Sequence, residues 1–458
     1  MQTNRSTLRV YAAVLCAGAT LTMAQCRTGT PGTDSADRGE SAAAAQSAAA
    51  GAAATAAAAQ AAARTAAVLP GLEVLLRDSA HLVRGRRVGF LTNQTAITSR
   101  GESGIDLLHA SPDVNLVALY GPEHGLRGGV DGGVKIASGI DEATGVPVHS
   151  LYGSVQRPTP EMLRGVEVLL FDMQDVGARP YTFVWTMAMA MEAAASQRIP
   201  FVVLDRPNPI TDRMEGPLME MAMRTVGQPL TGYFPVPLRH GMSVGEVARY
   251  INAEYAMGVD LSVVPAAGWR STQWFDETGL PWLNPSPNIR SLDAALTYSG
   301  LVLFEATNVT VGRGTDAPFS YLGAPWLDPG RLLQRIARYD IPGVALDTIR
   351  LVPEGEGWVP FRGETVRAIR IRITDRDAYQ PVWMTLVLMT EIRRQHPGDF
   401  RITNEGMTQM LGSRWARQAI DRGDDPSAIW TRWETELREW SRIRDRYALY
   451  RQRGQPLR

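Results

Sequence analysis

Cysteine and lysine are almost absent from this sequence of 458 residues. The two cysteines, Cys16 and Cys26, lie near the N-terminus, so the rest of the chain has neither a disulfide nor a catalytic thiol. Lys135 is the only lysine, and it lies in a glycine-rich stretch that lacks the P-loop pattern. These absences argue against a Schiff-base enzyme and a P-loop nucleotide-binding protein, and they leave catalysis to oxygen and nitrogen groups.

Signatures of metal and cofactor sites are also missing. The six histidines are scattered, with no HExxH pair and no cysteine partners, which argues against a zinc site. The G-x-S-x-G elbow of serine hydrolases is absent. A loose dinucleotide-like match at residues 312–317 runs directly into Pro318 instead of a helix. We therefore expect neither a metal nor a cofactor.

Charge of either sign is not in excess, because 47 basic residues balance 47 acidic ones. A nucleic-acid-binding protein is expected to carry a net basic face, so this balance argues against nucleic acid as a partner. Nearly all of the positive charge is on arginine, which favours planar, two-pronged contacts with carboxylates.

The first 26 residues have the layout of an export signal. Arg5 and Arg9 precede an apolar run over residues 10–23, which is too short to span a bilayer comfortably. Cys26 is a candidate for lipidation, although Gln25 before it is a poor match to the small residue preferred there. A membrane-anchored lipoprotein in the periplasm and a secreted protein both stay open. Residues 27–68 are expected to be a low-complexity, alanine-rich tether.

Short apolar runs alternate with helical patterns across residues 69–257. The clearest runs lie at residues 87–92, 114–122, 166–171 and 201–204, and continuous Val, Leu and Phe residues suit strands that are buried on both faces of a parallel sheet. Helical patterns lie between them, at residues 104–110 and 187–197. This alternation predicts an α/β fold with a Rossmann-like, doubly wound, mostly parallel sheet.

A smaller C-terminal α/β domain is expected over residues 258–458, with strands at residues 301–304 and 366–373. Large apolar residues at helical spacing between residues 430 and 447 predict a helix with a core-facing stripe.

Polar residues follow the apolar runs of the first domain. Asn93, Glu123, Asp172 and Asp205 each come at the carboxyl end of a predicted strand, where open α/β sheets bind ligands, so they are expected to converge on one crevice. Some of them suit helix caps equally well. For Asp205, which precedes Arg206-Pro-Asn208-Pro, a turn is at least as good an interpretation as catalysis.

Three segments carry groups suited to sugar chemistry. Glu123 lies in a Gly-flanked turn before His124, where restricted solvent would suit a general acid, although a helix-capping role is an even alternative. Residues 172–181 place two carboxylates, an amide, an arginine and a tyrosine on one loop. These groups can bind a polyhydroxylated ring, or an Asp–Arg pair among them can stabilise the loop itself. Residues 305–316 place a glutamate, expected at the end of a strand, before a Gly-bracketed Arg313.

Together these segments resemble the exo-β-N-acetylmuramidase family, formerly a domain of unknown function. The resemblance runs from about residue 71 to residue 450 and is carried by blocks at residues 92–95, 121–125, 171–179, 204–209, 239–242, 285–288, 305–308 and 312–315. It departs from the family at residues 93–96, Asn-Gln-Thr-Ala for Asn-Pro-Thr-Gly, and at Met173. It implies a Rossmann-like domain, a smaller C-terminal α/β domain and an active cleft between them. It also implies release of terminal N-acetylmuramic acid from the non-reducing end of peptidoglycan fragments, so that peptidoglycan-derived disaccharides or muropeptides are the expected partners.

The resemblance and the residue chemistry together suggest roles. Glu123 is the expected general acid, and its partner is expected to be Glu305 or, as second choice, Asp172. Arg313 or Arg179 is expected to bind the lactyl carboxylate that distinguishes muramic acid from N-acetylglucosamine. The other expected substrate-binding residues are Asn93, His124, Gln174, Asp175, Tyr181, Asp205, Arg206, Asn208, Arg239, His240, Asn288, Thr307, Asn308 and Thr315.

Two other functions fit the residues. Two α/β domains around a cleft are also the architecture of many exported proteins that bind a sugar or muropeptide without turnover. A metal-dependent phosphoesterase could use Asp172, Asp175, Asp205 and His240 around Mg²⁺, and it would lose activity with a chelator.

Overall fold

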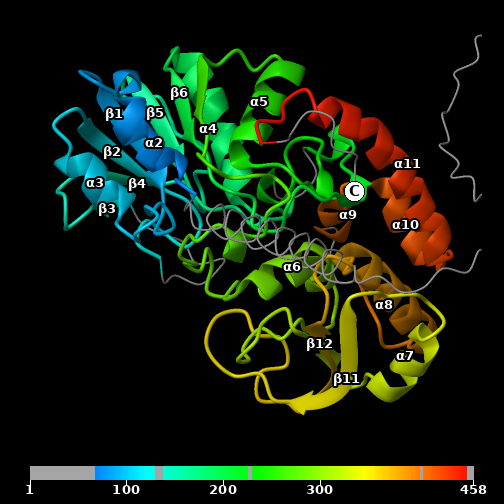
Figure 1. The fold of residues 1–458 in the computed structure, drawn as a ribbon. Coiled ribbons are helices and arrows are strands. Elements are labelled where there is room, and N and C mark those ends of the chain that lie inside the picture. The colour runs from blue at the N-terminus through cyan, green and yellow to red at the C-terminus, as the bar shows by residue number, and fades with distance from the viewer. Residues whose placement is uncertain (1–67, 129–137, 225–228, 403–405, 451–458) are drawn as a thin grey trace, which may run out of the picture. The chain divides into compact units, whose positions relative to one another are not determined.

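A seven-stranded sheet organises the first half of the chain (Figure 1). The structure is a computed structural model that describes residues 68–128, 138–224, 229–402 and 406–450. The expected export signal, Cys26 and nearly all of the expected tether therefore lie outside the described residues, as does Lys135. None of the helices in the described ranges is long and apolar enough to cross a membrane.

The strand order of this sheet is β3-β4-β2-β1-β5-β6-β9, and all neighbours are parallel except β3 and β4. The chain winds outward from β1 in one direction and from β5 in the other, which confirms the predicted doubly wound fold. The strands are β1 Arg87–Thr92, β2 Asn115–Gly121, β3 Gly139–Ile140, β4 Pro147–Ser150, β5 Val168–Asp172, β6 Phe201–Leu204 and β9 Leu261–Val264. Because β9 pairs with β6, the sheet extends past the domain boundary expected at residue 257.

Helices cover both faces of this sheet. Alternate strand residues point to opposite faces, so Phe90 and Leu170 pack in one cluster with α2 and α3, whereas Leu91 and Phe171 pack in another with α4 and α5. Nearly all of α4 is buried, as expected for a helix that is apolar on every side. The bounds are α2 Gly71–Asp78, α3 Gly104–Ala110, α4 Phe183–Gln197 and α5 Val244–Glu254. The helix predicted at residues 104–110 is confirmed, and the one predicted at residues 187–197 forms most of α4.

The second half contains a three-stranded antiparallel sheet in the order β10-β12-β11. Its strands are β10 Tyr321–Ala324, β11 Val344–Leu351 and β12 Val366–Ile373, and β12 has the predicted bounds. Three helices accompany it, α6 Leu292–Leu301, α7 Pro329–Ile336 and α8 Pro381–Gln395. A two-stranded ribbon, β7 Glu215–Leu218 and β8 Pro237–Arg239, lies between β6 and α5 in sequence.

The strand predicted at residues 301–304 is wrong. Helix α6 ends there and is followed by a 3-10 helix, η5 Val302–Ala306, which carries Glu305. Val302, Leu303 and Phe304 are all buried, and a short, fully buried apolar run has no periodicity by which a strand can be told from a helix.

The C-terminal helices return to the first half of the chain. Helix α11 Pro426–Arg444 follows α9 Gly406–Leu411 and α10 Arg414–Arg422, and it buries Trp433, Leu437 and Trp440 as the stripe predicts. Beyond it, the hydroxyl of Tyr450 donates to Asp205 over 2.6 Å. The remaining short elements are the 3-10 helices η1 Ala80–Leu82, η2 Met221–Met223, η3 Pro229–Thr231 and η4 Phe275–Glu277.

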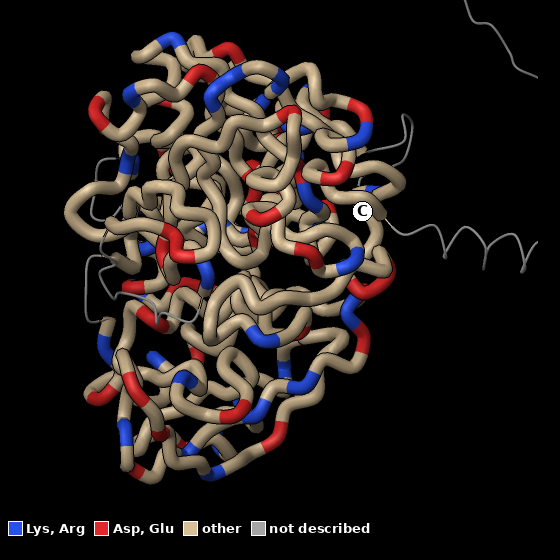
Figure 2. The backbone as a smooth tube through the Cα atoms, turned by 90° about the vertical axis from the view of Figure 1, so that its left-hand side faces the viewer, with Lys and Arg blue, Asp and Glu red and all other residues tan. Residues whose placement is uncertain are grey.

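Basic and acidic residues are interspersed along the described chain (Figure 2). Many form ion pairs, such as Arg84 with Asp113 and Arg370 with Asp347. The charge balance of the composition is therefore also a local balance on the folded chain.

Candidate active site

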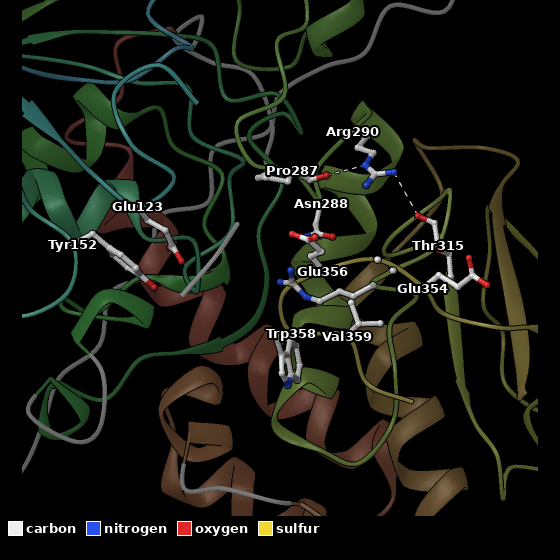
Figure 3. A pocket seen from close by; sticks show the side chains of 13 residues that line it. Glu123, Tyr152, Pro287, Asn288, Arg290, Thr315, Glu354, Glu356, Trp358 and Val359 are labelled. Atoms are coloured by element: carbon white, nitrogen blue, oxygen red, sulfur yellow. Dashed lines mark hydrogen bonds between the residues drawn. The ribbon is translucent and has the colours of Figure 1, made fainter. Parts of the chain in front are cut away.

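Two adjoining cavities share Glu123, Tyr152 and Arg313 in their walls. We call the smaller, of about 160 Å³, the inner chamber and the larger, of about 600 Å³, the outer chamber. Figure 3 shows the outer chamber, with Glu123 and Tyr152 on one side and Asn288, Thr315, Glu354 and Trp358 on the other. The two sides come from the two halves of the chain.

The turn after β2 presents Glu123 to both chambers. This turn is tight, since His124 and Gly125 have φ angles of 70° and 80°. The Oγ1 hydroxyl of Thr182, at the N-terminus of α4, donates to Oε2 of Glu123 over 3.0 Å. Glu123 is thus half-buried, oriented from one side and in contact with the cavity on the other.

Glu305 and Arg313 form an ion pair in the wall of the inner chamber. Their side chains are 13% and 20% exposed, so both groups keep some surface towards the cavity. Burial by itself lowers the pKa of Arg313, but the negative charges of Glu305 and Glu123 outweigh burial and raise this pKa. Arg313 therefore keeps its positive charge, and this charge interacts with both glutamates.

The loop that carries Arg313 is held in one conformation. Gly312 and Gly314 have φ angles of 84° and 80°, which side chains other than glycine rarely adopt. A Cβ on Gly314 would also collide with the carbonyl oxygen of Glu354. The Arg313 guanidinium carbon lies 5.5 Å from the ring centroids of both Phe319 and Trp358.

Two buried tyrosines, Tyr181 and Tyr298, complete one side of the inner chamber. Their ring centroids are 5.8 Å apart in an edge-to-face arrangement. Burial raises the pKa of both hydroxyls well above the usual value, and the nearby carboxylates, including Glu123 and Asp175, raise it further. Both tyrosines therefore stay protonated at neutral pH. The Tyr181 hydroxyl oxygen is itself buried and lies beside Ser286.

The predicted convergence of the strand-end residues is wrong, because Glu123 alone among the four lines these chambers. Asp172 is fully buried and forms an ion pair with Arg206, whose Nη2 lies 3.0 Å from Oδ2. Asp172 therefore does not face Glu123 across a cavity, and the second choice for the catalytic partner is corrected.

Asp205 and Asn93 likewise serve the protein's own structure. Asp205 is fully buried and accepts hydrogen bonds from Ser243 and Tyr450, each over 2.6 Å. The Oδ1 atom of Asn93 accepts from the backbone of Thr95 over 3.0 Å. The interpretation of Asp205 as part of a turn and anchor is the better one.

The arginines predicted beside the cleft divide in the same way. Arg179 is 1% exposed and donates to the backbone carbonyls of Gln409 and Met410, so the structure does not place it where a lactyl group could reach it. Arg239 is fully buried and pairs with Glu215 over 2.6 Å. Arg313 is the predicted arginine that reaches the cavity.

Several other predicted binding residues make contacts within the protein. Asp175 accepts from His240 over 3.3 Å, and the Gln174 side chain donates to the carbonyl of Pro207 over 2.9 Å. Neither Asp175 nor Gln174 lines the inner or the outer chamber. The remaining side-chain contacts to the backbone are Asn208 to Met242, Thr307 to Phe304 and Asn308 to Asp399.

The proposed metal site does not form in the described ranges, where no three His, Cys, Asp or Glu side chains come together in a metal-binding group. Of the four residues suggested for a phosphoesterase, only Asp175 and His240 are in contact. Asp172 and Asp205 are committed to Arg206 and to Ser243 with Tyr450. The donor set for Mg²⁺ is therefore not assembled.

The predicted residues that line the inner chamber are Glu123, His124, Tyr181, Glu305 and Arg313, whereas Asn288 and Thr315 line the outer one. Tyr298 and Trp358 were not predicted. Tyr298 lies in a helix whose pattern reads as core, and Trp358 lies in a Gly-rich loop outside every block that drew attention.

Comparisons with known proteins identify the family of this chain. The N-terminal and C-terminal models of the exo-β-N-acetylmuramidase NamZ match residues 88–293 and 296–450. A peptidoglycan β-N-acetylmuramidase NamZ from Bacillus subtilis (strain 168) is 38% identical over 385 residues, which cover 84% of this chain and 91% of that protein.

Two solved structures, both DUF1343 family proteins from Bacteroides fragilis, share the fold. One has a TM-score of 0.77 at 31% identity, and the other has a TM-score of 0.68 at 26% identity. Each comparison covers 84% of this chain and 99% of the solved one. The two family models together span most of the described residues, and the chain belongs to the exo-β-N-acetylmuramidase NamZ family.

Proposed function

We propose that this chain is an exo-acting glycoside hydrolase that releases N-acetylmuramic acid from the non-reducing end of peptidoglycan fragments, in cell-wall turnover or recycling. Family membership and the relative from Bacillus subtilis support the reaction and the substrate class. The observation that carries the proposal is that Glu123 from the first half and Glu305 from the second line one chamber. Glycosidases of most families use such a pair of carboxyl groups.

Glu123 acts as the general acid in this proposal. It lines both chambers, so it can reach a glycosidic oxygen that joins a sugar in one to a sugar in the other. As the bond from the anomeric carbon to that oxygen breaks, Glu123 gives its proton to the oxygen. The hydrogen bond from Thr182 fixes the orientation of the carboxyl group during this transfer.

Glu305 acts as the partner carboxylate. It must be ionised to attack the anomeric carbon or to remove a proton from the attacking water, and the positive charge of Arg313 lies directly beside it. Glu305 lines the inner chamber and not the outer one, which assigns the reacting sugar to the inner chamber.

Arg313 also recognises the lactyl carboxylate in this proposal. Its Nε donates to Glu305, and the two terminal nitrogens of the guanidinium offer further N–H groups. A charge-assisted hydrogen bond of this kind distinguishes muramic acid from N-acetylglucosamine, which lacks the carboxylate.

We further propose that the protein acts outside the cytoplasm. The arginine-flanked apolar run before Cys26 and the alanine-rich stretch after it support export of the folded part. Mass spectrometry of the mature N-terminus tests this, because signal cleavage with a lipidated Cys26 indicates a lipoprotein, an unmodified cleaved end indicates secretion, and an intact Met1 contradicts export.

Turnover separates the hydrolase from its alternatives. The purified protein is expected to hydrolyse an aryl N-acetylmuramide and to retain full activity with a chelator. Saturable binding without turnover would indicate a binding protein. Loss of activity with the chelator would support the metal-dependent phosphoesterase instead. The product anomer in the first minutes, observed by NMR, then distinguishes retention from inversion.

Rescue chemistry tests Glu305. The Glu305→Ala variant is expected to be inactive and to recover activity with azide, giving a glycosyl azide whose configuration reports whether Glu305 is a nucleophile or a base. A variant with wild-type activity would remove Glu305 from the partner role.

A further inference from the structure

The outer chamber extends the active site away from the reacting carboxyl groups. Its volume of about 600 Å³ lies within the range of roughly 300–1,000 Å³ that small-molecule sites occupy. Asn288, Arg290, Thr315 and Glu356 offer polar groups around it, on the side opposite Glu123 (Figure 3). Such a wall can form hydrogen bonds with the hydroxyl and amide groups of a sugar.

Trp358 is the largest apolar side chain in this wall, which also contains Pro287 and Val359. Its residue surface is 54% exposed, although tryptophan is usually highly buried in a folded protein. An indole that borders a cavity presents a large flat surface that can stack against the C–H groups of a pyranose ring, while its N–H serves as a donor.

The loop that carries Trp358 is tied to the catalytic wall. This loop joins β11 to β12, and the backbone N–H of Glu354 donates to the carbonyl of Gly314 over 2.7 Å. Further along, the Arg362 guanidinium donates to the carbonyl of Gly357 over 2.6 Å. The first bond ties the loop to the segment that carries Arg313, and the second braces the loop internally.

Arg313 connects this wall to the reacting groups. Its guanidinium lies 5.5 Å from the Trp358 ring centroid and is paired with Glu305. Trp358 therefore holds a set position relative to the carboxylate that faces the reacting sugar. A ring seated on Trp358 would be one residue further along the glycan than the ring beside Glu305.

We propose that the outer chamber is the subsite for the leaving sugar, an N-acetylated hexosamine, and that Trp358 is its stacking platform. This inference rests on the proposed function, because it assumes that the terminal muramic acid occupies the inner chamber. Glu123 borders both chambers and therefore lies where the bond between the two sugars must be. Trp358 then binds the natural leaving group and contributes to the preference for glycans over small glycosides.

The test compares two substrates that differ only in what leaves. One is the disaccharide in which N-acetylmuramic acid is linked to N-acetylglucosamine, and the other is N-acetylmuramyl fluoride, whose leaving fluoride fills no subsite. For Trp358→Ala we expect kcat/KM on the disaccharide to fall about tenfold more than on the fluoride, the size of a lost aromatic contact. Trp358→Phe should recover part of this difference.

Ile140→Ala is the matched control, since Ile140 is 69% exposed and lines neither chamber. It should leave both substrates unchanged. If Trp358→Ala lowers kcat/KM equally on both substrates, or on neither, the subsite assignment is wrong while the muramidase activity stands. If the wild-type protein hydrolyses neither substrate, the proposed function itself fails.

Discussion

Two groups of charged residues that come from the same set of sequence blocks have different surroundings. The first, which we call the buried belt, consists of Asp172 with Arg206, Asp205 with Ser243 and Tyr450, and Arg239 with Glu215. The second is the chamber group of Glu123, Glu305 and Arg313.

Exposure and partnering separate the two groups. Side chains of the ion pairs in the belt are at most 6% exposed, and each has a charged partner. Glu305 and Arg313 also pair, but they are 13% and 20% exposed and line a cavity. In a pair that is closed to solvent, loss of one partner leaves a buried charge unpaired and destabilises the fold, whereas a pair with a remaining open side can meet a substrate. We therefore expect substitutions in the chamber group to lower activity and substitutions in the buried belt to lower stability.

The largest effect on activity is expected at Glu123. Glu123→Gln removes the transferable proton while keeping the shape of the side chain, so kcat should fall by about 10²–10⁴-fold, the usual contribution of a positioned acid. Turnover of an aryl N-acetylmuramide measures the rate, and thermal unfolding should give a midpoint close to that of the wild type. Near-normal turnover by a folded variant would move the acid role to another residue.

Asp172 is expected to show the opposite behaviour. Asp172→Ala leaves the Arg206 guanidinium buried without its partner, which typically lowers the free energy of unfolding by about 3–5 kcal/mol. Chemical denaturation measures this loss. The fraction that stays folded should hydrolyse the substrate with nearly wild-type kcat. A stable variant with kcat reduced by orders of magnitude would place Asp172 back in the reaction.

Glu246, which contacts the backbone of Ser243 beside the buried belt, gives the stability of the fold a pH dependence. Burial raises its pKa to about 7, although its two oxygens accept hydrogen bonds from the backbone of Leu449 and Ser243. Because the folded-state pKa exceeds the unfolded one, this contribution to stability is complete below about pH 4.3 and is lost as the pH rises towards 7. Each pKa unit corresponds to about 1.36 kcal/mol, so the effect amounts to a few kcal/mol.

Glu246→Gln tests this dependence. The amide does not titrate, so the difference in free energy of unfolding between wild type and variant should change steadily from pH 4.5 to pH 7 and then level off. The variant loses one acceptor and should be less stable than the wild type at low pH. A difference that is constant with pH would show that Glu246 keeps one protonation state across this range. Activity per folded molecule should follow the wild type.

Most of the fold could be predicted, because the patterns that specify its strands and helices lie within short stretches of the sequence. Continuous apolar runs followed by helical periodicity specify buried parallel strands, and β1, β2, β5 and β6 are where the runs lie. The strand expected before Glu305 failed because η5 is buried on all sides and carries no periodic signal. The blocks that surround the site could also be identified.

Which residues of those blocks reach the cavity could not be predicted, because their partners are remote in sequence. Asp205 is occupied by Tyr450, 245 residues away, and Arg179 by the carbonyl of Met410, 231 residues away. No local pattern contains this information. Trp358 lies on a loop whose place beside Arg313 follows from the hydrogen bond between Glu354 and Gly314.

The smallest of these effects is expected in the sugar selectivity of Arg313. Losing a guanidinium that binds the lactyl carboxylate should lower the preference for an aryl N-acetylmuramide over the matching N-acetylglucosaminide by about ten- to a hundredfold, since such a hydrogen bond contributes ~1.5–3 kcal/mol. Arg313→Met removes the donors and the positive charge beside Glu305, so the rate should fall on both sugars, but more on the muramide. Arg313→Lys keeps the charge and loses the planar fork, so it should reduce the preference with a smaller loss of rate.

Arg179→Met is the matched control. The Arg179 guanidinium binds only backbone carbonyls in the described contacts, so this variant should affect stability without altering the ratio of the rates on the two sugars. An unchanged ratio in both Arg313 variants, beside a general loss of activity, would reduce Arg313 to the partner of Glu305 and leave recognition of the lactyl group to another residue of the chambers.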